Sequence, residues 1–257
     1  MRYFLCLIFC LSLCNINGQV NTGITDDGRI IKIPVVIHLV KKGKKHNVPQ
    51  IITKEIIEKE LKDLNTNFSA QNDMSTLNDY FVSRDLIGKP NFQFYLKEVI
   101  KHKRHKRRAK RIKRVDPDKN LNIIVGKYGN ASPCTLAEGY EPEFIQINYT
   151  NFGDGSQTVT HEIGHWLGLF HVWGMAGNCR RSRNPTPDFI DDTPTQFSCT
   201  DVKRENECPP ADVSTKPNYN NFMDYSSCRC FFTKGQVKTM REKVIKFRNI
   251  IFTNSID

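Results

Sequence analysis

After its first 14 residues, the sequence has no apolar run long enough to cross a bilayer as a helix, which takes about 20 residues. It has no internal repeat either, and this excludes solenoids and propellers. The full chain has 257 residues, of which 39% are hydrophobic and 10% aromatic. That is enough for a folded core in one domain or two closely joined lobes. We therefore expect a globular protein without a transmembrane segment.

The N-terminal residues have the pattern of a secretory signal peptide. One positive charge precedes an apolar run from Phe4 to Cys14, and small and polar residues follow. The run is too short for a permanent membrane span, although a membrane anchor or a buried core helix is the alternative interpretation. We predict a signal peptide at 1–18, a short segment at 19–30 and a secreted, extracellular domain at 31–257.

Cysteine is absent between Cys14 and Cys134, and an even number of cysteines follows the predicted cleavage site. In a secreted chain this is typical of disulfide bonds, whose pairing the residues by themselves leave open. Bridges would hold the region from Trp173 to Asn221, which is poor in periodic structure. The cysteines concerned are Cys134, Cys179, Cys199, Cys208, Cys228 and Cys230.

Acidic residues are absent from 101–114, which contains ten Lys or Arg residues and two His. This stretch carries nearly all of the formal net charge of +11. It is a solvated surface loop, a processing site with convertase-like sequences, or a docking segment for extracellular polyanions such as glycosaminoglycans. No aromatic residues are interleaved with the cations, so we expect no specific nucleic-acid binding.

Hydrophobic periodicity predicts a sheet with helices, followed by one C-terminal helix. The predicted strands are 32–40, 91–100, 121–125 and 144–149. The predicted helices are 53–64, one that follows and is capped by the turn at 154–156, and one from Thr233 onward. The fold class is α+β, with a mixed sheet and two helices in a first lobe and an irregular, disulfide-stapled second lobe. We expect the active site between the lobes, where an extended peptide could pair with an edge strand.

Residues 161–171 hold the most informative pattern. His161 and His165 are four residues apart, so both imidazoles project from one helix face and can share a zinc ion. Glu162 can reach a water molecule at that ion without ligating it. Gly168 can end the helix in a left-handed conformation, after which the chain can turn back and present His171. Three imidazoles and one open position are typical of a catalytic zinc site, whereas structural sites close all four positions.

This string resembles that of the metzincin metalloproteases, and further motifs resemble the pappalysin type within that clan. Those motifs are His171-Val172-Trp173-Gly174, Asp191-Asp192-Thr193-Pro194 with Gln196, Asn221-Phe222-Met223-Asp224-Tyr225, and the opening strand Ile33-Pro34-Val35-Val36-Ile37-His38. The resemblance runs from about residue 31 to the C-terminus and implies a two-lobed, metzincin-like catalytic domain.

The resemblance also assigns roles around the metal. It implies zinc ligation by His161, His165 and His171, with Glu162 as the general base. Zinc would polarise the scissile carbonyl, and Glu162 would take the proton of the attacking water.

Other roles follow from the same resemblance. Met223 would lie beneath the zinc ion, and Tyr225 would line the site and donate a hydrogen bond to the tetrahedral oxyanion. Family members often hold calcium in the loop after the third ligand, where Asp188, Asp191 and Asp192 are the candidate oxygen ligands.

The chain departs from the family pattern in its cysteines and near the methionine. The resemblance pairs Cys179 with Cys208 and Cys199 with Cys228, and leaves Cys134 and Cys230 for a candidate third bridge. No mature cysteine precedes Cys134, so a propeptide thiol that silences the zinc is not available. Related enzymes that favour basic residues after the scissile bond carry an acid just before the cysteine that follows the methionine, whereas this chain has Ser227 there.

We therefore expect a secreted zinc endopeptidase that acts on proteins or peptides. The alternative, from another class, is a secreted polyanion-binding protein that retains an inactive protease fold. All the named catalytic positions are intact in the sequence, which favours the enzyme.

Overall fold

The computed structural model describes residues 28–41, 47–75, 77–102, 109–128, 144–174, 187–200 and 217–248. The predicted signal peptide at 1–18 and the cysteines Cys134, Cys179 and Cys208 lie outside the described residues. Within the described ranges, no helix is both long enough and apolar enough to cross a membrane.

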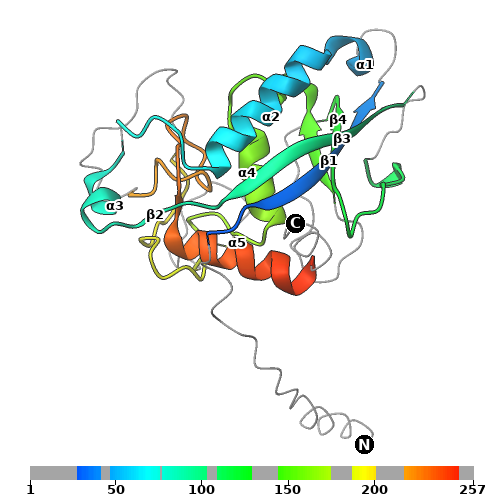
Figure 1. Ribbon diagram of the computed structural model, residues 1–257. Coiled ribbons are helices and arrows are strands. Elements are labelled where there is room, and N and C mark those ends of the chain that lie inside the picture. Colours follow the sequence, from blue (N-terminus) through cyan, green and yellow to red (C-terminus); the bar gives the residue numbers. More distant parts are fainter. Residues whose placement is uncertain are drawn as a thin grey trace, which may run out of the picture.

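A four-stranded sheet in the order β3-β1-β4-β5 forms the centre of the fold (Figure 1). Its strands are β1 (Ile31–Val40), β3 (Phe92–His102), β4 (Leu121–Gly126) and β5 (Ile145–Asn148). Every described pairing among them is parallel, so the expectation of a mixed sheet is wrong for the described strands. Parallel neighbours need long crossover connections, and β1 and β3 are joined by one that contains α2 (Lys54–Phe68).

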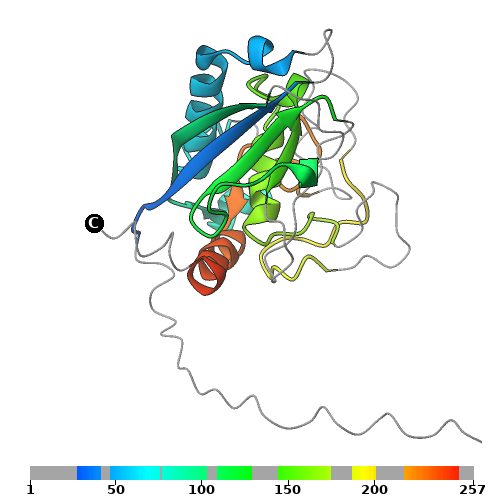
Figure 2. The ribbon, with the colours of Figure 1, turned by 90° about the vertical axis from the view of Figure 1, so that its right-hand side faces the viewer.

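Helices α2 and α4 (Thr158–Trp166) lie on the same face of the sheet (Figure 2). Helix α2 begins at its N-cap Thr53, whose Oγ1 accepts a hydrogen bond from Ile56 N at 3.4 Å. Apolar side chains of both helices and of alternate strand positions form one continuous core. This core includes Ile33, Ile37, Leu64, Phe68, Phe94, Ile123, Ile163 and Trp166.

The opposite face of the sheet is covered by the segment that joins β3 to β4. Val40 and Ile124 point away from the helices, because neighbouring strand residues alternate between the two faces. They pack against Ala109 and Ile112, which are only 2% and 1% exposed. Part of the basic stretch at 101–114 is therefore anchored to the sheet, with a short 3₁₀ helix at Ala109–Arg111.

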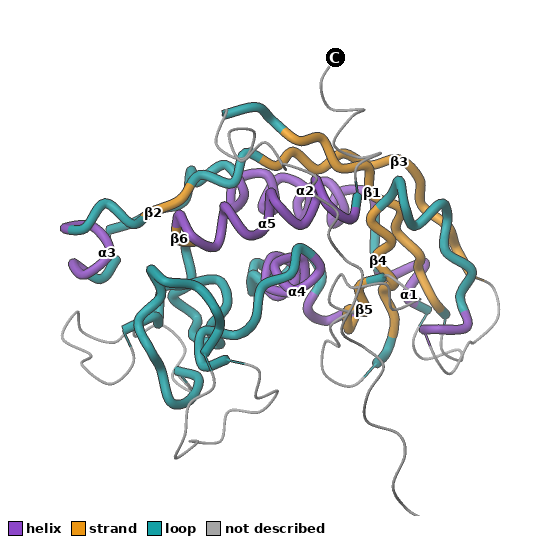
Figure 3. Tube along the Cα trace, turned by 90° about the horizontal axis from the view of Figure 1, so that it is seen from below, coloured by secondary structure: helices purple, strands orange, loops and turns teal. Residues whose placement is uncertain are grey.

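The remaining described elements are α5 (Lys234–Phe247), two short helices and a small antiparallel ladder. Helix α5 begins with a capping box, in which Thr233 and Gln236 each accept a backbone hydrogen bond from the other residue. The ladder pairs β2 (Ile87–Gly88) with β6 (Phe232–Thr233). The short helices, which periodicity did not predict, are α1 (Val48–Ile51) and α3 (Asp79–Ser83). Figure 3 shows α4 between the sheet and the irregular segments that precede β6.

The cysteines agree only in part with the expected bridges. Cys199 and Cys228 are both disulfide-bonded. Cys230, by contrast, is a free and buried thiol, so the third bridge between Cys134 and Cys230 is wrong. Cys230 packs in a small apolar cluster with Leu77, Phe81 and Phe231, and burial raises its pKa to about 12. It therefore behaves as an apolar core residue.

Candidate metal centre

Helix α4 carries the first two histidines. Its N-cap is Gln157, which has a left-handed φ of 53° and makes no side-chain capping bond. The prediction that 154–156 cap the helix is therefore wrong. Asp154 instead accepts a hydrogen bond from Ser156 N at 3.0 Å and closes the turn before the helix. The other end agrees with expectation, because Gly168 adopts a φ of +93° and the chain turns back toward the helix.

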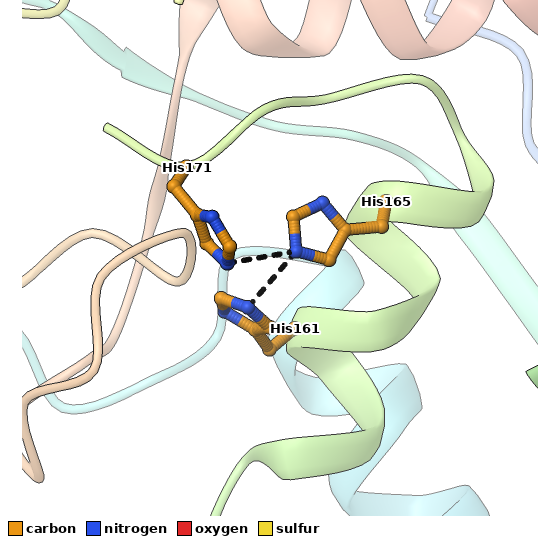
Figure 4. A group of neighbouring side chains, drawn as sticks. All are labelled: His161, His165 and His171. Carbon is orange, nitrogen blue, oxygen red and sulfur yellow. Dashed lines mark hydrogen bonds between the residues drawn. The ribbon is translucent and has the colours of Figure 1, made fainter. Parts of the chain in front are cut away.

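The three predicted histidines converge on one point (Figure 4). His165 Nε2 lies 3.1 Å from His161 Nε2 and 3.1 Å from His171 Nε2. Within the described part of the chain, this is the one group of three such ligand atoms within 4.8 Å of one another. Zn–N bonds of about 2.0–2.1 Å in a tetrahedron separate the nitrogens by about 3.3 Å. The observed spacing fits that geometry.

The opposite ring nitrogens determine what the Nε2 atoms can do. His161 Nδ1 donates to Phe222 O at 2.7 Å, and His165 Nδ1 donates to Leu169 O at 2.8 Å. A neutral imidazole that carries its proton on Nδ1 presents a lone pair at Nε2. Two lone pairs that face each other are unfavourable unless a cation lies between them. The donor set therefore fits a zinc ion, and the carbonyl partners would orient the ligands.

Burial keeps the imidazoles of His161 and His165 neutral, as metal ligation requires. Burial lowers the pKa of His165 to about 4. Burial, together with the neighbouring charges of His165 and Arg229, lowers the pKa of His161 well below its usual range. Both rings are therefore uncharged at neutral pH, each with a single proton on Nδ1.

Glu162 lies in the same buried turn of α4 and is 5% exposed. Its Oε2 is buried and has no hydrogen-bond partner. Burial raises its pKa to about 8, and the positive charge of Arg229 acts in the opposite direction. A divalent cation beside Glu162 would lower this pKa further. An unpartnered buried carboxyl beside three converging imidazoles suits a general base.

Met223 packs against α4, where the sequence motif places it. Its side chain is fully buried, and a Cβ atom added to Gly164 would collide with the Met223 sulfur. Gly164 is thus the helix position at which the methionine segment approaches. Sequence reasoning assigned it no role, although a glycine inside a helix is a signal of such close approach.

Tyr225 and Trp173 surround the third histidine. Tyr225 Oη lies 3.0 Å from His171 Nε2, and the Tyr225 side chain is 44% exposed. The Trp173 ring stacks on His171, with centroids 4.3 Å apart and an interplanar angle of 6°. Trp173 also meets Tyr225 edge to face at 4.8 Å. Trp173 was part of a recognised motif, but its contact with a ligand was not predicted.

The three acids suggested for calcium do not converge. Asp188 accepts hydrogen bonds from Ile190 N at 3.1 Å and Thr193 Oγ1 at 2.6 Å. Asp192 accepts from Thr233 Oγ1 at 2.6 Å and from Gly235 N at 2.7 Å, at the start of α5. Asp191 is exposed. Two of the carboxylates thus have protein donors as partners, and a calcium ion at these acids stays a prediction.

Gln196 and Asp224 tie the loop after the third ligand to the methionine segment. Asp224 accepts hydrogen bonds from Thr200 N and Tyr225 N, each at 2.8 Å, and from Gln196 Nε2 at 3.2 Å. Gln196 Oε1 in turn accepts from Asn218 N at 3.2 Å. This buried network joins the segments of the two recognised motifs.

Comparisons with known proteins agree with this geometry. The family model described as pregnancy-associated plasma protein-A matches residues 139–245. An extracellular metalloprotease of Aspergillus fumigatus is 39% identical over 137 residues, which are 52% of this chain and 39% of that protein. One of Arthroderma gypseum is 37% identical over 94 residues, which are 35% of this chain and 30% of that protein. The chain thus spans less than half the length of the curated relatives that it matches.

A solved structure covers more of the chain. Mature mirolysin of Tannerella forsythia, in complex with a cleaved peptide, has a TM-score of 0.64 and 25% identity, covering 86% of this chain and 98% of that one. The family model over residues 139–245, the mirolysin-like fold and the converging histidines together show that this chain is similar to the pappalysin-type metzincin metalloproteases.

Proposed function

We propose that this protein is an extracellular zinc endopeptidase that hydrolyses peptide bonds in proteins and peptides. The observation that carries the proposal is the convergence of three imidazoles next to Glu162, a buried carboxyl with an unpartnered oxygen. The extracellular location rests on the predicted signal peptide and on relatives named extracellular metalloproteases.

Each of five residues has a role in the proposed hydrolysis. His161, His165 and His171 would hold a zinc ion, which would supply the Lewis acid for the scissile carbonyl and the attacking water. Glu162 takes the proton from the attacking water and passes it to the leaving amine. The Tyr225 hydroxyl donates a hydrogen bond to the oxygen that becomes negative in the transition state.

The test replaces the base and keeps the ligands. Glu162→Gln should retain bound zinc but lower kcat/KM on unfolded polypeptides by about 10²–10⁴-fold, the usual contribution of general acid–base catalysis. The matched control is Glu58→Gln, since Glu58 is an exposed residue of α2 that forms a surface ion pair with Lys54. Unchanged turnover in the Glu162 variant would refute the mechanism.

We further propose that the basic stretch at 101–114 binds extracellular polyanions. Its described residues Ala109 and Ile112 pack on the sheet face opposite α4. These anchors place the described end of the stretch on the face of the sheet away from the histidine triad, which supports polyanion binding apart from the reaction. The opposing view, an inactive protease fold that only binds polyanions, has no support from the intact triad.

A further inference from the structure

The chain contains three copies of the acceptor pattern for N-linked glycosylation, Asn-X-Ser or Asn-X-Thr with a middle residue other than proline. They begin at Asn67, Asn130 and Asn148. Asn130 lies outside the described residues. Because an N-linked glycan is bulky and must lie on the surface, the folded protein can keep one only where the side-chain nitrogen of the asparagine reaches solvent. The other two patterns differ in this respect.

The fold excludes a glycan on Asn67. This residue of α2 is 7% exposed. Its Nδ2, the atom that would carry the glycan, donates a buried hydrogen bond to Thr160 Oγ1 at 2.7 Å. Thr160 belongs to α4 and directly precedes His161. A glycan on this nitrogen would break the contact between the two helices, so the pattern at Asn67 is incompatible with the folded metal centre.

Asn148 lies in the opposite kind of surroundings. It is the last residue of β5, where the backbone is extended at φ −67° and ψ 133°, and the 3₁₀ turn Tyr149–Asn151 follows it. Asn148 is half-buried, whereas Thr150, the third residue of the pattern, is exposed. The end of a strand and the turn after it thus present this pattern at the surface.

The amide of Asn148 is oriented for a glycan. Its Oδ1 is buried and has no hydrogen-bond partner, so the nitrogen Nδ2 is the amide atom on the solvent side. Nδ2 forms no hydrogen bond with the described residues, and attachment of a glycan to it therefore breaks none. At Asn67, by contrast, the same atom holds two helices together.

The side chain of Asn148 also points away from the metal centre. Along β5 the buried Ile145 and Ile147 contribute to the core that includes α4. Strand residues alternate between the two faces, so Asn148 lies on the other face. Its neighbour on that face is Gln146, which pairs with Ile124 of β4, and Ile124 packs against the anchored end of the basic stretch.

We infer that the secreted protein carries an N-linked glycan on Asn148 and none on Asn67. The donor is the lipid-linked oligosaccharide diphosphate of the secretory pathway. A bond forms between Nδ2 and the first sugar, the bond from that sugar to the diphosphate breaks, and the proton lost from Nδ2 leaves with the lipid diphosphate. The inference rests on the extracellular location of the protein and not on its peptidase activity.

The experiment maps glycan occupancy on the full chain, produced with its own N-terminus in a eukaryotic secretory host. Enzymatic removal of N-glycans converts each modified asparagine to aspartate, which mass spectrometry of the peptides detects. Asn148 should be recovered as aspartate and Asn67 as asparagine. Thr150→Ala keeps Asn148 but destroys the pattern, so it should lose the glycan, whereas Thr150→Ser should keep it. Ser69→Ala, the matched change at the other pattern, should leave the glycan content unchanged.

Activity gives an independent readout. The Glu162→Gln protein should carry the same glycan as the wild type, because occupancy does not depend on hydrolysis. The Thr150→Ala protein should turn over a small peptide as fast as the wild type, since the glycan lies on the far face of the sheet, and a loss of turnover in the folded variant would contradict that placement. Recovery of Asn148 as asparagine from secreted wild-type protein, or of Asn67 as aspartate, would overturn the inference, and neither result depends on whether a variant folds.

Discussion

At the scale of single residues, Gly164 shows how the metal centre constrains the helix that carries it. A glycine in a helix interior costs about 0.5–1 kcal/mol relative to alanine. Here the missing side chain leaves room for the sulfur of Met223, which is fully buried against α4. The missing side chain thus permits the close approach of the segment at Met223. In the same segment, the Phe222 carbonyl accepts the hydrogen bond from His161.

The substitution Gly164→Ala tests this packing by the sign of its effect. In an open helix alanine would stabilise the protein, whereas here the new methyl group overlaps the Met223 sulfur. We expect a loss of about 1–3 kcal/mol in the free energy of unfolding, as in other overpacked cores, measured by urea denaturation.

Combining Gly164→Ala with Met223→Ala makes space for the new methyl group. The two losses should therefore be less than additive. A stabilised Gly164→Ala protein would mean that the close approach is not present.

At the scale of elements, α2 holds the turn that leads into α4. Glu60 of α2 is 7% exposed and accepts a hydrogen bond from Gly153 N at 2.5 Å. Burial raises its pKa to about 7, with further contributions from Asp63 and Asp154. The carboxyl thus binds its proton more tightly in the folded chain than in the unfolded one.

This shift predicts a pH dependence of stability. Because the folded pKa is raised, the folded state binds more protons than the unfolded state between about pH 4.5 and 7. The Glu60 contribution to stability therefore falls as the pH rises through that window. Glu60→Gln keeps an acceptor for Gly153 N but carries no charge.

We expect Glu60→Gln to unfold near the wild-type Tm at pH 5 and to be more stable than the wild type at pH 8, by about 1–3 kcal/mol. Thermal unfolding at both values measures this. The exposed Glu58→Gln is again the control, and a variant less stable than the wild type at pH 8 contradicts the account.

The carboxylate of Asp192 holds the N-terminus of helix α5, as the Glu60 carboxyl holds the turn before α4. The Asp192 carboxylate accepts from Thr233 Oγ1 and Gly235 N at the positive end of the helix. Asp192→Ala should cost about 1–2 kcal/mol of stability, as lost N-terminal caps do.

If the role of Asp192 is to cap α5, the cost should be the same in calcium and in a chelator selective for calcium. A loss of Tm that appears only in the presence of calcium would instead favour the predicted calcium site. Thermal unfolding under both conditions decides between the two roles.

At the scale of the whole molecule, the sequence predicted those features of the fold and of the metal centre that depend on local spacing. His161 and His165 project from one helix face because they are four residues apart, and the main strands followed from apolar runs. What it did not predict depends on distant partners. The orienting carbonyl of Phe222, the stacking of Trp173 on His171 and the free state of Cys230 arise only when remote segments pack together. Parallel strand pairing likewise follows from the crossovers.

The basic stretch is a whole-molecule feature as well, since it carries nearly all of the net charge of +11. Replacing 103–108 with a short neutral loop leaves the anchors Ala109 and Ile112 in place. Retention on heparin should then be lost, because counterion release scales with the number of cations. Turnover of a small peptide should stay within about threefold, because screened charges act weakly at a distance. Retention that is unchanged, or turnover that is lost in the folded variant, contradicts the assignment.

The most direct test of the central claim is the metal content and coordination of the purified protein. X-ray absorption should find one zinc per chain with three imidazole nitrogens at about 2.0–2.1 Å. Removal of zinc by a chelator should abolish peptide hydrolysis, and one equivalent of zinc should restore it. His165→Ala should lose both the metal and the activity. Hydrolysis by metal-free protein, or full zinc occupancy in the His165 variant, would contradict the account.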